Sequence, residues 1–352
     1  FFKQKTAYES SLGLVGSEMC IRDRYLTYRL ALVIKPGHSL FAIGSASILA
    51  FTPMFVFISG SINNDNLAML IASATILIAS NGRDIDKHKV RIGFTLGKNY
   101  YTIAGDISVL HVLLGVLLGL GALTKLSLLT LFPIVGLSIS YNKVLHWWND
   151  PNRKYFKSCI SYALLLIFQL VVIFGTAIAI CGWWFLRNLR LYGSLTGINM
   201  FMEVLGQRSH SAPLAQLWSE RIGFMQSYWG LFGAVNVPLP HWVYATLNTL
   251  SIFSIVGLIM LLVRKLKESG WQKKQWFPLA LNVMFICVVI VSLIRWATDT
   301  WSSQGRLVFT AIQSITVLFT LGIYSIVPSN FNKVRPFIIC LLYTSPSPRD
   351  RG

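Results

Sequence analysis

The segment WWFLRNLRLYG at residues 183–193 combines aromatic rings with side chains that can bind a phosphate group. Arg187 carries a planar fork of N–H donors that fits two phosphate oxygens at once, and Asn188 and Tyr192 add further hydrogen-bonding groups. The aromatic residues are equally typical of the belt that anchors a helix where it leaves a membrane. Under either interpretation, the segment lies at the boundary between lipid and water.

Two further basic side chains stand beside apolar runs, Lys125 in GALTK and Arg306 in QGR. Lys125 can extend to the membrane surface along its aliphatic stem, or it can hold a fixed positive charge against a lipid-linked phosphate. Arg306, which follows Gln304, is either an anchor at the polar boundary or another phosphate contact. These three residues are therefore candidates for phosphate binding.

The segment SINND at residues 61–65 follows an apolar run that contains Pro53 and leads directly into the next run. Asn and Asp side chains cap helix N-termini, so a capped turn is one explanation for Asn64 and Asp65. Asp65 is also the only acid between Tyr25 and Asp84. An acid at a membrane boundary is a natural ligand for substrate or metal, so a divalent metal is the one cofactor that these residues suggest.

Trp229 lies in SYWGLFG at residues 227–233, where aromatic residues alternate with small ones. Its ring could stack on a sugar, or it could simply anchor the segment near the membrane. The sequence contains no HExxH, Walker loop, GxSxG or paired-cysteine metal motif. The templates of soluble enzymes therefore do not apply to this chain.

The candidate residues separate apolar runs that are long enough to cross roughly 30 Å of hydrocarbon. Helices buried in a soluble bundle would keep a polar face, which these runs lack. The pattern predicts an all-α polytopic membrane protein with about eight transmembrane helices. The predicted runs are 39–59, 65–80, 107–123, 126–141, 158–182, 242–263, 277–296 and 307–327.

The basic residues predict how these helices are oriented. Residues 25–339 carry 25 Lys or Arg and nine acidic residues, and 18 of the 25 fall in one alternating set of connections. Basic connections stay on the cytoplasmic side, so the candidate residues are expected on the outer side, where 183–241 forms a long loop with a helical stretch at 212–225. Topology and anionic lipid account for the net charge, so the bilayer is the expected partner and nucleic acid is not.

Both ends of the chain are predicted to be translated sequencing adapter. One short DNA element can encode residues 341–350 on one strand and residues 14–22 on the other, which two unrelated protein termini have no reason to share. We therefore expect residues 1–24 and 340–352 to be adapter-derived. Residues 25–339 would then be the membrane domain, lacking its natural N-terminal part.

Taken in order along the chain, Pro53 with SINND, GALTK, WWFLRNLRLYG, SYWGLFG and QGR resemble the polytopic GT-C glycosyltransferases of bacteria. This broad group is related to protein O-mannosyltransferases and lipid A aminoarabinose transferases, and the nearest branch consists of predicted membrane proteins. The resemblance covers most of residues 25–339. It depends on the order of short segments and on their places between apolar runs.

The resemblance implies a GT-C-like fold and transfer of a sugar from a polyprenyl-phosphate donor to an acceptor on the outer side of a bacterial plasma membrane. The family's catalytic acid lies between its first two spans, a region that would precede Tyr25, so this chain by itself is expected to be inactive. The remaining candidates would bind the donor or, at Asp65, a metal: Asn64, Asp65, Lys125, Arg187, Asn188, Tyr192, Trp229, Gln304 and Arg306.

Two functions of other classes stay open. A transporter or flippase for a lipid-linked or amphipathic solute would favour internal repeats and ionisable residues near the middle of the membrane. The sequence shows no repeat, and its polar residues gather at one face instead. A structural subunit of an envelope assembly is the third interpretation, because a shared fold does not fix chemistry.

Overall fold

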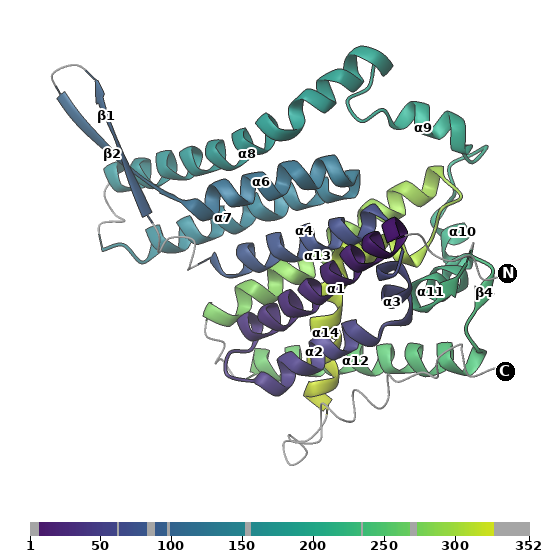
Figure 1. The fold of residues 1–352 in the computed structure, drawn as a ribbon. Coiled ribbons are helices and arrows are strands. Elements are labelled where there is room, and N and C mark those ends of the chain that lie inside the picture. The colour runs from purple at the N-terminus through teal and green to yellow at the C-terminus, as the bar shows by residue number, and fades with distance from the viewer. Residues whose placement is uncertain are drawn as a thin grey trace. The chain divides into compact units, whose positions relative to one another are not determined.

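The computed structural model describes residues 7–61, 63–82, 89–96, 99–151, 156–233, 235–267 and 273–326. These residues are predominantly helical (Figure 1), and they divide into two compact units. Unit 1 comprises Phe1–Ser73 with Gly206–Gly352, and unit 2 comprises Ala74–Leu205. The connection 328–339 and the predicted adapter at 340–352 lie outside the described residues, and the adapter origin of both ends stays a prediction.

The protein is an all-α polytopic membrane protein, as predicted. Five described helices are long and apolar enough to cross a membrane, and a bent pair, Ser39–Phe51 with Pro53–Ser59, brings the number to six. The remaining two predicted runs form the shorter apolar helices Asn64–Ser80 and Val109–Thr124. Each of the eight predicted runs therefore coincides with helix, although two of the helices are short for a complete span.

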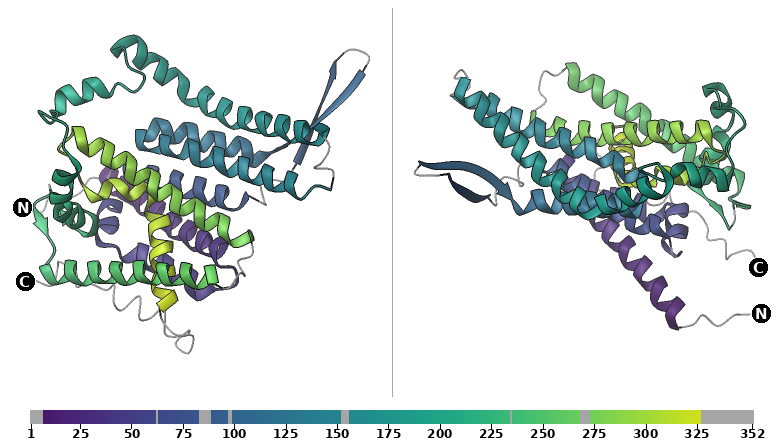
Figure 2. Two further views of the ribbon diagram at one scale, coloured as in Figure 1. Left: turned by 180° about the vertical axis from the view of Figure 1, so that it is seen from behind. Right: turned by 90° about the horizontal axis from the view of Figure 1, so that it is seen from above.

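Unit 1 is built mainly from long helices, which the two views of Figure 2 show from behind and from above. The bend of 66° between α2 and α3 lies at Thr52 and Pro53. Proline lacks an N–H and forces the preceding residue into an extended conformation, so the helix must break there. The elements of unit 1 are α1 (Ala7–Ile34), α2 (Ser39–Phe51), α3 (Pro53–Ser59), the first half of α4 (Asn64–Ser80), α10 (Leu214–Ser219), α11 (Arg221–Trp229), β3 (Leu231–Phe232), β4 (Val237–Pro238), α12 (His241–Lys267), α13 (Lys273–Asp299), the 3-10 helix η2 (Gly305–Ala311) and α14 (Ile312–Ile326).

Helix α14 is deeply buried in unit 1 and crosses α12 at a very close contact. The Ser254 hydroxyl donates a hydrogen bond to the Phe319 carbonyl at 2.8 Å. A Cβ on Gly257 would lie 2.0 Å from the carbonyl oxygen of Gly322, and a Cβ on Gly322 would lie 2.0 Å from that of Ser254. Small residues therefore allow the two backbones to touch, as they do at many contacts between membrane helices.

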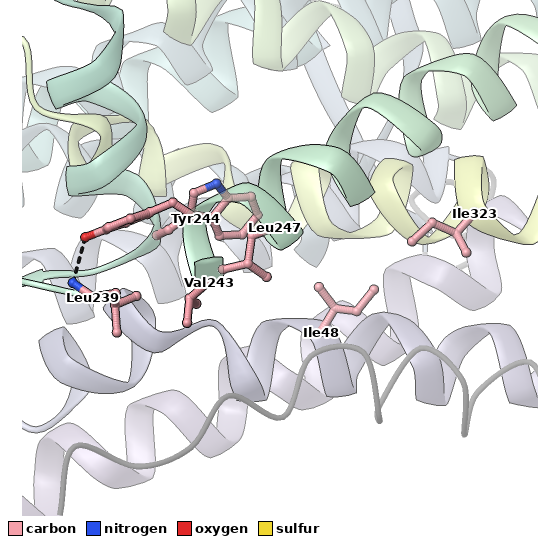
Figure 3. Packing of buried hydrophobic residues seen from close by; sticks show 7 residues of the cluster. Ile48, Leu239, Val243, Tyr244, Leu247 and Ile323 are labelled. Atoms are coloured by element: carbon pink, nitrogen blue, oxygen red, sulfur yellow. Dashed lines mark hydrogen bonds between the residues drawn. The ribbon is translucent and has the colours of Figure 1, made fainter. Parts of the chain in front are cut away.

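A buried cluster joins the start of α12 to the loop that precedes it, and Figure 3 shows its side chains. The Tyr244 hydroxyl donates to the carbonyl of Gly230 at 2.5 Å and accepts from the N–H of Leu239 at 2.9 Å. One aromatic side chain thus fixes the residues on either side of the small β3–β4 pair to α12. The members of the cluster are Ile48, Trp229, Leu239, Val243, Tyr244, Leu247 and Ile323.

Unit 2 is a bundle of helices with a hairpin of two strands. Helix α6 runs parallel to α8, because a Cβ on Gly115 would meet Ile173 and Thr176 whereas one on Gly119 would meet Ala177 and Ile180. Helix α7 lies beside both. The elements of unit 2 are the second half of α4, β1 (Lys89–Leu96), β2 (Asn99–Ser108), α6 (Val109–Thr124), the 3-10 helix η1 (Leu126–Thr130), α7 (Leu131–Trp148), α8 (Phe156–Tyr192) and α9 (Ile198–Leu205).

Two features of unit 2 differ from the prediction. The connection 81–106 contains the antiparallel hairpin of β1 and β2, which was not predicted, although Val90, Ile92, Phe94 and Leu96 alternate with other residues in the manner of a strand. Helix α8 has 37 residues, so it does not end at residue 182 but continues to Tyr192. At 1.5 Å per residue it is about 55 Å long, and its last turns extend beyond the thickness of the hydrocarbon layer.

We predict that Gly257→Ala destabilises the protein and that Gly175→Ala does not. The new methyl group at position 257 would meet backbone 2.0 Å away, whereas nothing lies within 4 Å of a Cβ at position 175. Overpacking of this kind costs about 1–3 kcal/mol, while alanine in an open helical position is neutral or stabilising. The free energy of unfolding of both variants can be measured in detergent micelles. Equal stability of the two would contradict the close crossing of α12 and α14.

Candidate functional site

Gly305, in the segment QGR, lies directly against α11. Its N–H donates to the Ser227 hydroxyl at 2.7 Å, and a Cβ at this position would lie 2.3 Å from the Phe224 carbonyl oxygen. Only glycine allows this approach, because any side chain would collide with the backbone of α11. The contact brings QGR and SYWGLFG, which are far apart in the sequence, to one place in unit 1.

The turn between α3 and α4 also lies in this part of unit 1. Helix α11 contacts α3, and the rings of Phe57 and Phe232 lie 5.2 Å apart. The Pro53–SINND segment, SYWGLFG and QGR therefore meet at one end, which we call the motif end of unit 1: the α3–α4 turn at 60–66, the segment 206–240 and the turn 300–306. Three of the five segments that carry the family resemblance share this end.

The aromatic residues of SYWGLFG are packed inside the motif end. Trp229 is only 4 % exposed, and its indole N–H donates to the side-chain oxygen of Asn248 at 2.9 Å. The ring of Tyr228 meets those of Trp229 and Phe309 edge-on, and burial raises the pKa of the Tyr228 hydroxyl, so this residue stays neutral. Of the two interpretations of Trp229, anchoring the segment fits its burial, and an exposed platform for a sugar does not.

The SINND turn has the geometry of a helix cap. The side-chain oxygen of Asn63 accepts from the backbone N–H of Asp65, and its amide donates to the Asp65 carboxylate, both at 3.2 Å. Asn66 is buried, and its amide donates to the carbonyls of Ser61 and Ile58 at 2.9 and 3.3 Å. The capped turn is therefore present, with Asn64 exposed and Asp65 half-buried in the first turn of α4.

Arg208 links its own segment to Glu220 and to the turn at 300–303 of the motif end, and no motif in the sequence pointed to it. Its side chain is 2 % exposed and pairs with both oxygens of Glu220, at 2.9 and 2.8 Å. Its Nε donates to the Thr300 carbonyl at 2.8 Å, and its guanidinium lies 4.5 Å from the ring of Trp301. The Ser303 hydroxyl donates to Glu220 at 2.7 Å, so this ion pair fixes the turn that contains QGR.

The arginines of this end differ in how their charge is compensated. Arg306 is half-buried, yet it makes no hydrogen bond, ion pair or ring contact with a described residue. Gln304, also half-buried, precedes the first turn of η2 without capping it. The other arginines at this end have partners, because Arg208 pairs with Glu220, and Arg221 packs on the Trp218 ring and donates to the Trp218 carbonyl. Arg295, near the end of α13 next to this end, pairs with Asp299.

In unit 2, WWFLRNLRLYG forms the last turns of α8. Trp183, Arg187 and Arg190 are exposed and spaced at zero, four and seven residues, which places them on one face of the helix. Neither arginine makes a hydrogen bond or ion pair with any residue that the structure describes. An exposed face of aromatic and basic residues is typical of a helix that passes through the lipid headgroup layer.

Asn188 and Tyr192 lie where the chain turns back on the end of α8. Asn188 is buried and Tyr192 is exposed. Gly197, with a positive φ of 66°, lies against both residues: a Cβ there would be 3.8 Å from the Asn188 amide carbon and 3.4 Å from the Tyr192 ring. Asn188 thus lies under the turn 193–197, while Tyr192 is open to a ligand or to lipid.

Lys125 forms the break between α6 and η1, as predicted for a turn between two runs. It is half-buried and extended, with φ −156° and ψ 129°, and its N–H donates to the Gly121 carbonyl. Because α6 and α8 run parallel, with Gly119 beside Ile180, Lys125 lies at the level of the last turns of α8, near Arg187 along the axis. GALTK and WWFLRNLRLYG therefore share one end, the motif end of unit 2.

Known proteins were compared with the whole chain. No family model matches it, and neither does any curated protein. The chain is similar to a solved structure, the archaeal oligosaccharyltransferase AglB from Archaeoglobus fulgidus in complex with an inhibitory peptide and a dolichol-phosphate, at 13% identity and a TM-score of 0.46. That match covers 95% of this chain but 43% of AglB, so the chain spans less than half of that protein.

We predict that Arg208→Met destabilises unit 1, whereas Arg221→Met has little effect. The first change leaves the Glu220 carboxylate without its cation, and the cost should be about 3 kcal/mol, at the low end for a buried pair because Glu220 is 25% exposed. Arg221 is exposed, so its loss should cost less than about 0.5 kcal/mol. The loss of unfolding free energy in each variant can be measured by unfolding in detergent.

A second change tests whether the pair itself is responsible. The double variant Arg208→Met/Glu220→Leu removes both charges, so it should recover part of the lost stability. If the double variant is less stable than Arg208→Met alone, the loss does not come from an uncompensated carboxylate.

Proposed function

We propose that the intact protein is a membrane glycosyltransferase that transfers a sugar from a polyprenyl-phosphate donor to an acceptor on the outer side of a bacterial plasma membrane. One observation supports this proposal above the others. Arg306 is half-buried without a countercharge in the described chain, at the end where three family-like segments meet. A guanidinium in that state is suited to bind an anionic ligand.

A phosphate group is the anion that fits Arg306 best. The planar fork of arginine matches two phosphate oxygens, and Gln304, one residue from Gly305, offers neutral donors nearby. Arg208 of the same end and Arg295 of the adjoining α13 supply the contrast, since both already have carboxylate partners. We therefore assign Arg306 as the principal phosphate contact of unit 1, with Gln304 in support.

The motif end of unit 2 also presents basic side chains. Lys125 and Arg187 lie at the same level, and Arg190 is exposed on the same face of α8 as Arg187. In this unit, these basic residues would attract the phosphate of a lipid-linked donor to the membrane surface. Tyr192 would contact the donor from the exposed side, while Asn188, which is buried, would hold the turn behind it.

The catalytic acid is proposed to precede Tyr25 in the intact protein. Asp65 is engaged with Asn63 in the cap of α4, so we give it a secondary role. No group of three or more His, Cys, Asp or Glu side chains among the described residues could hold a metal. A divalent metal bound at Asp65 would thus need the donor phosphates to complete its ligands, as Mg²⁺ often does.

We predict that Arg306→Gln weakens binding of undecaprenyl phosphate by about 10- to 100-fold, because a charge-assisted hydrogen bond contributes about 1.5–3 kcal/mol. The matched control is Arg221→Gln, which removes an exposed arginine of the same end that packs on Trp218. It should change the affinity by less than about twofold, the range of a screened surface charge. Tryptophan fluorescence of the chain in lipid nanodiscs, titrated with the lipid, gives the affinities.

The same titration can overturn the proposal. Equal affinity of the wild type and Arg306→Gln would show that Arg306 does not bind the phosphate. If the wild type binds the lipid and, in liposomes, moves a fluorescent derivative from one leaflet to the other, the flippase would replace the transferase as the function.

A further inference from the structure

Two side chains at the junction of η2 and α14 are buried with unused hydrogen-bonding groups. Gln313 is 3 % exposed, and neither its side-chain oxygen nor its nitrogen has a partner in the described chain. Thr310 is 5 % exposed, and its hydroxyl is also without a partner there. The two residues are three positions apart, which places them on one face in either kind of helix.

The other polar side chains of α14 show that this is not a general property of the helix. Each serine and threonine hydroxyl of α14 has a partner at 2.6 to 2.8 Å: Ser314 donates to Asn282, Thr316 to Ile312, Thr320 to Thr316, and Ser325 to Leu321. Asn282 in turn donates to the Pro278 carbonyl at 2.7 Å. Within η2 and α14, the buried groups without a partner are therefore confined to Thr310 and Gln313.

The position of Gln313 on α14 indicates which side of the helix these groups occupy. Gly322, which touches α12, lies nine residues or two and a half turns away, so Gln313 is on the opposite face. Tyr324 lies eleven residues or about three turns away, on the same face as Gln313, and packs on Phe41 of α2 at 5.8 Å. The unused groups thus lie on the α2 side of α14, away from the small-residue crossing.

Burial of an amide and a hydroxyl without partners is unfavourable, and leucine or valine would fill the same space without that cost. The chemistry of the groups restricts what could satisfy them. Gln313 offers two N–H donors and one acceptor, and Thr310 offers a donor and an acceptor. Helix α14 carries no charged residue, and the charged residue of η2, Arg306, lies four positions before Thr310 and seven before Gln313. A neutral group that both donates and accepts, a hydroxyl, fits this set.

We infer that Thr310 and Gln313 form a binding site for neutral hydroxyl groups, supplied by a sugar or by water. The inference does not depend on the phosphate contact at Arg306, because it uses different side chains and an uncharged ligand. Unit 1 would then recognise neutral hydroxyl groups at this site, in addition to the charged phosphate at Arg306.

The test uses the full chain in lipid nanodiscs with methyl-β-D-glucopyranoside as the sugar probe. If sugar hydroxyls occupy the site, the glucoside should raise the thermal unfolding midpoint of the wild type by about 2 °C more than that of Gln313→Leu. Thr310→Val removes only the hydroxyl and should lose part of the response. Thr316→Val is the matched control, since its hydroxyl is bonded to Ile312 within the same helix, and it should respond like the wild type.

A second measurement separates the two sources of hydroxyl. Solid-state NMR of glutamine side-chain nitrogens identifies the Gln313 amide by its absence in Gln313→Leu, or in Gln313→Met if that variant folds better. A cross-peak from this amide to water, without a response to the glucoside, supports the site with water as its ligand. No glucoside response beyond that of Gln313→Leu and no water cross-peak would overturn the inference.

Discussion

The motif end of unit 1 depends above all on one close contact, the one between Gly305 and α11. The N–H of Gly305 is bonded to Ser227, and the absence of a side chain lets the start of η2 lie against helix backbone. This contact sets the position of Arg306, the next residue. It also holds the Trp229 segment between η2 and α12, where Asn248 and Tyr244 complete its hydrogen bonds. The arrangement of residues that are about 80 positions apart thus follows from the size of one residue.

The arginines at and near the motif ends fall into two groups. Arg208 and Arg295 each have a carboxylate that compensates their charge, and breaking the buried pair of Arg208 would leave the Glu220 carboxylate without its cation. Arg187, Arg190 and Arg306 have no such partners among the described residues. This division, rather than the number of basic residues, is the basis for assigning phosphate binding to particular side chains.

Much of the fold could be predicted from the sequence, because apolar length and proline act locally. The eight runs, the break at Pro53 and the turn at Lys125 all follow from such local rules. The ion pair of Arg208 with Glu220 could not be predicted, since it depends on how the 206–220 segment folds onto the turn at 300–303. Whether Trp229 is buried or exposed could not be predicted for the same reason. The β1–β2 hairpin and the extension of α8 to Tyr192 did leave local signs, an alternating pattern and a continuous helix-forming segment, which the emphasis on apolar runs missed.

Arg306 is proposed to compensate its charge with a lipid phosphate. Solid-state NMR can measure this directly, through dipolar coupling between the guanidinium nitrogens of labelled arginine and the phosphorus of undecaprenyl phosphate in nanodiscs. We expect a coupling at hydrogen-bonding range in the wild type that disappears in Arg306→Lys, whose amine lacks the labelled fork. A coupling that is unchanged in Arg306→Lys, or that is absent from the wild type, would contradict the proposal.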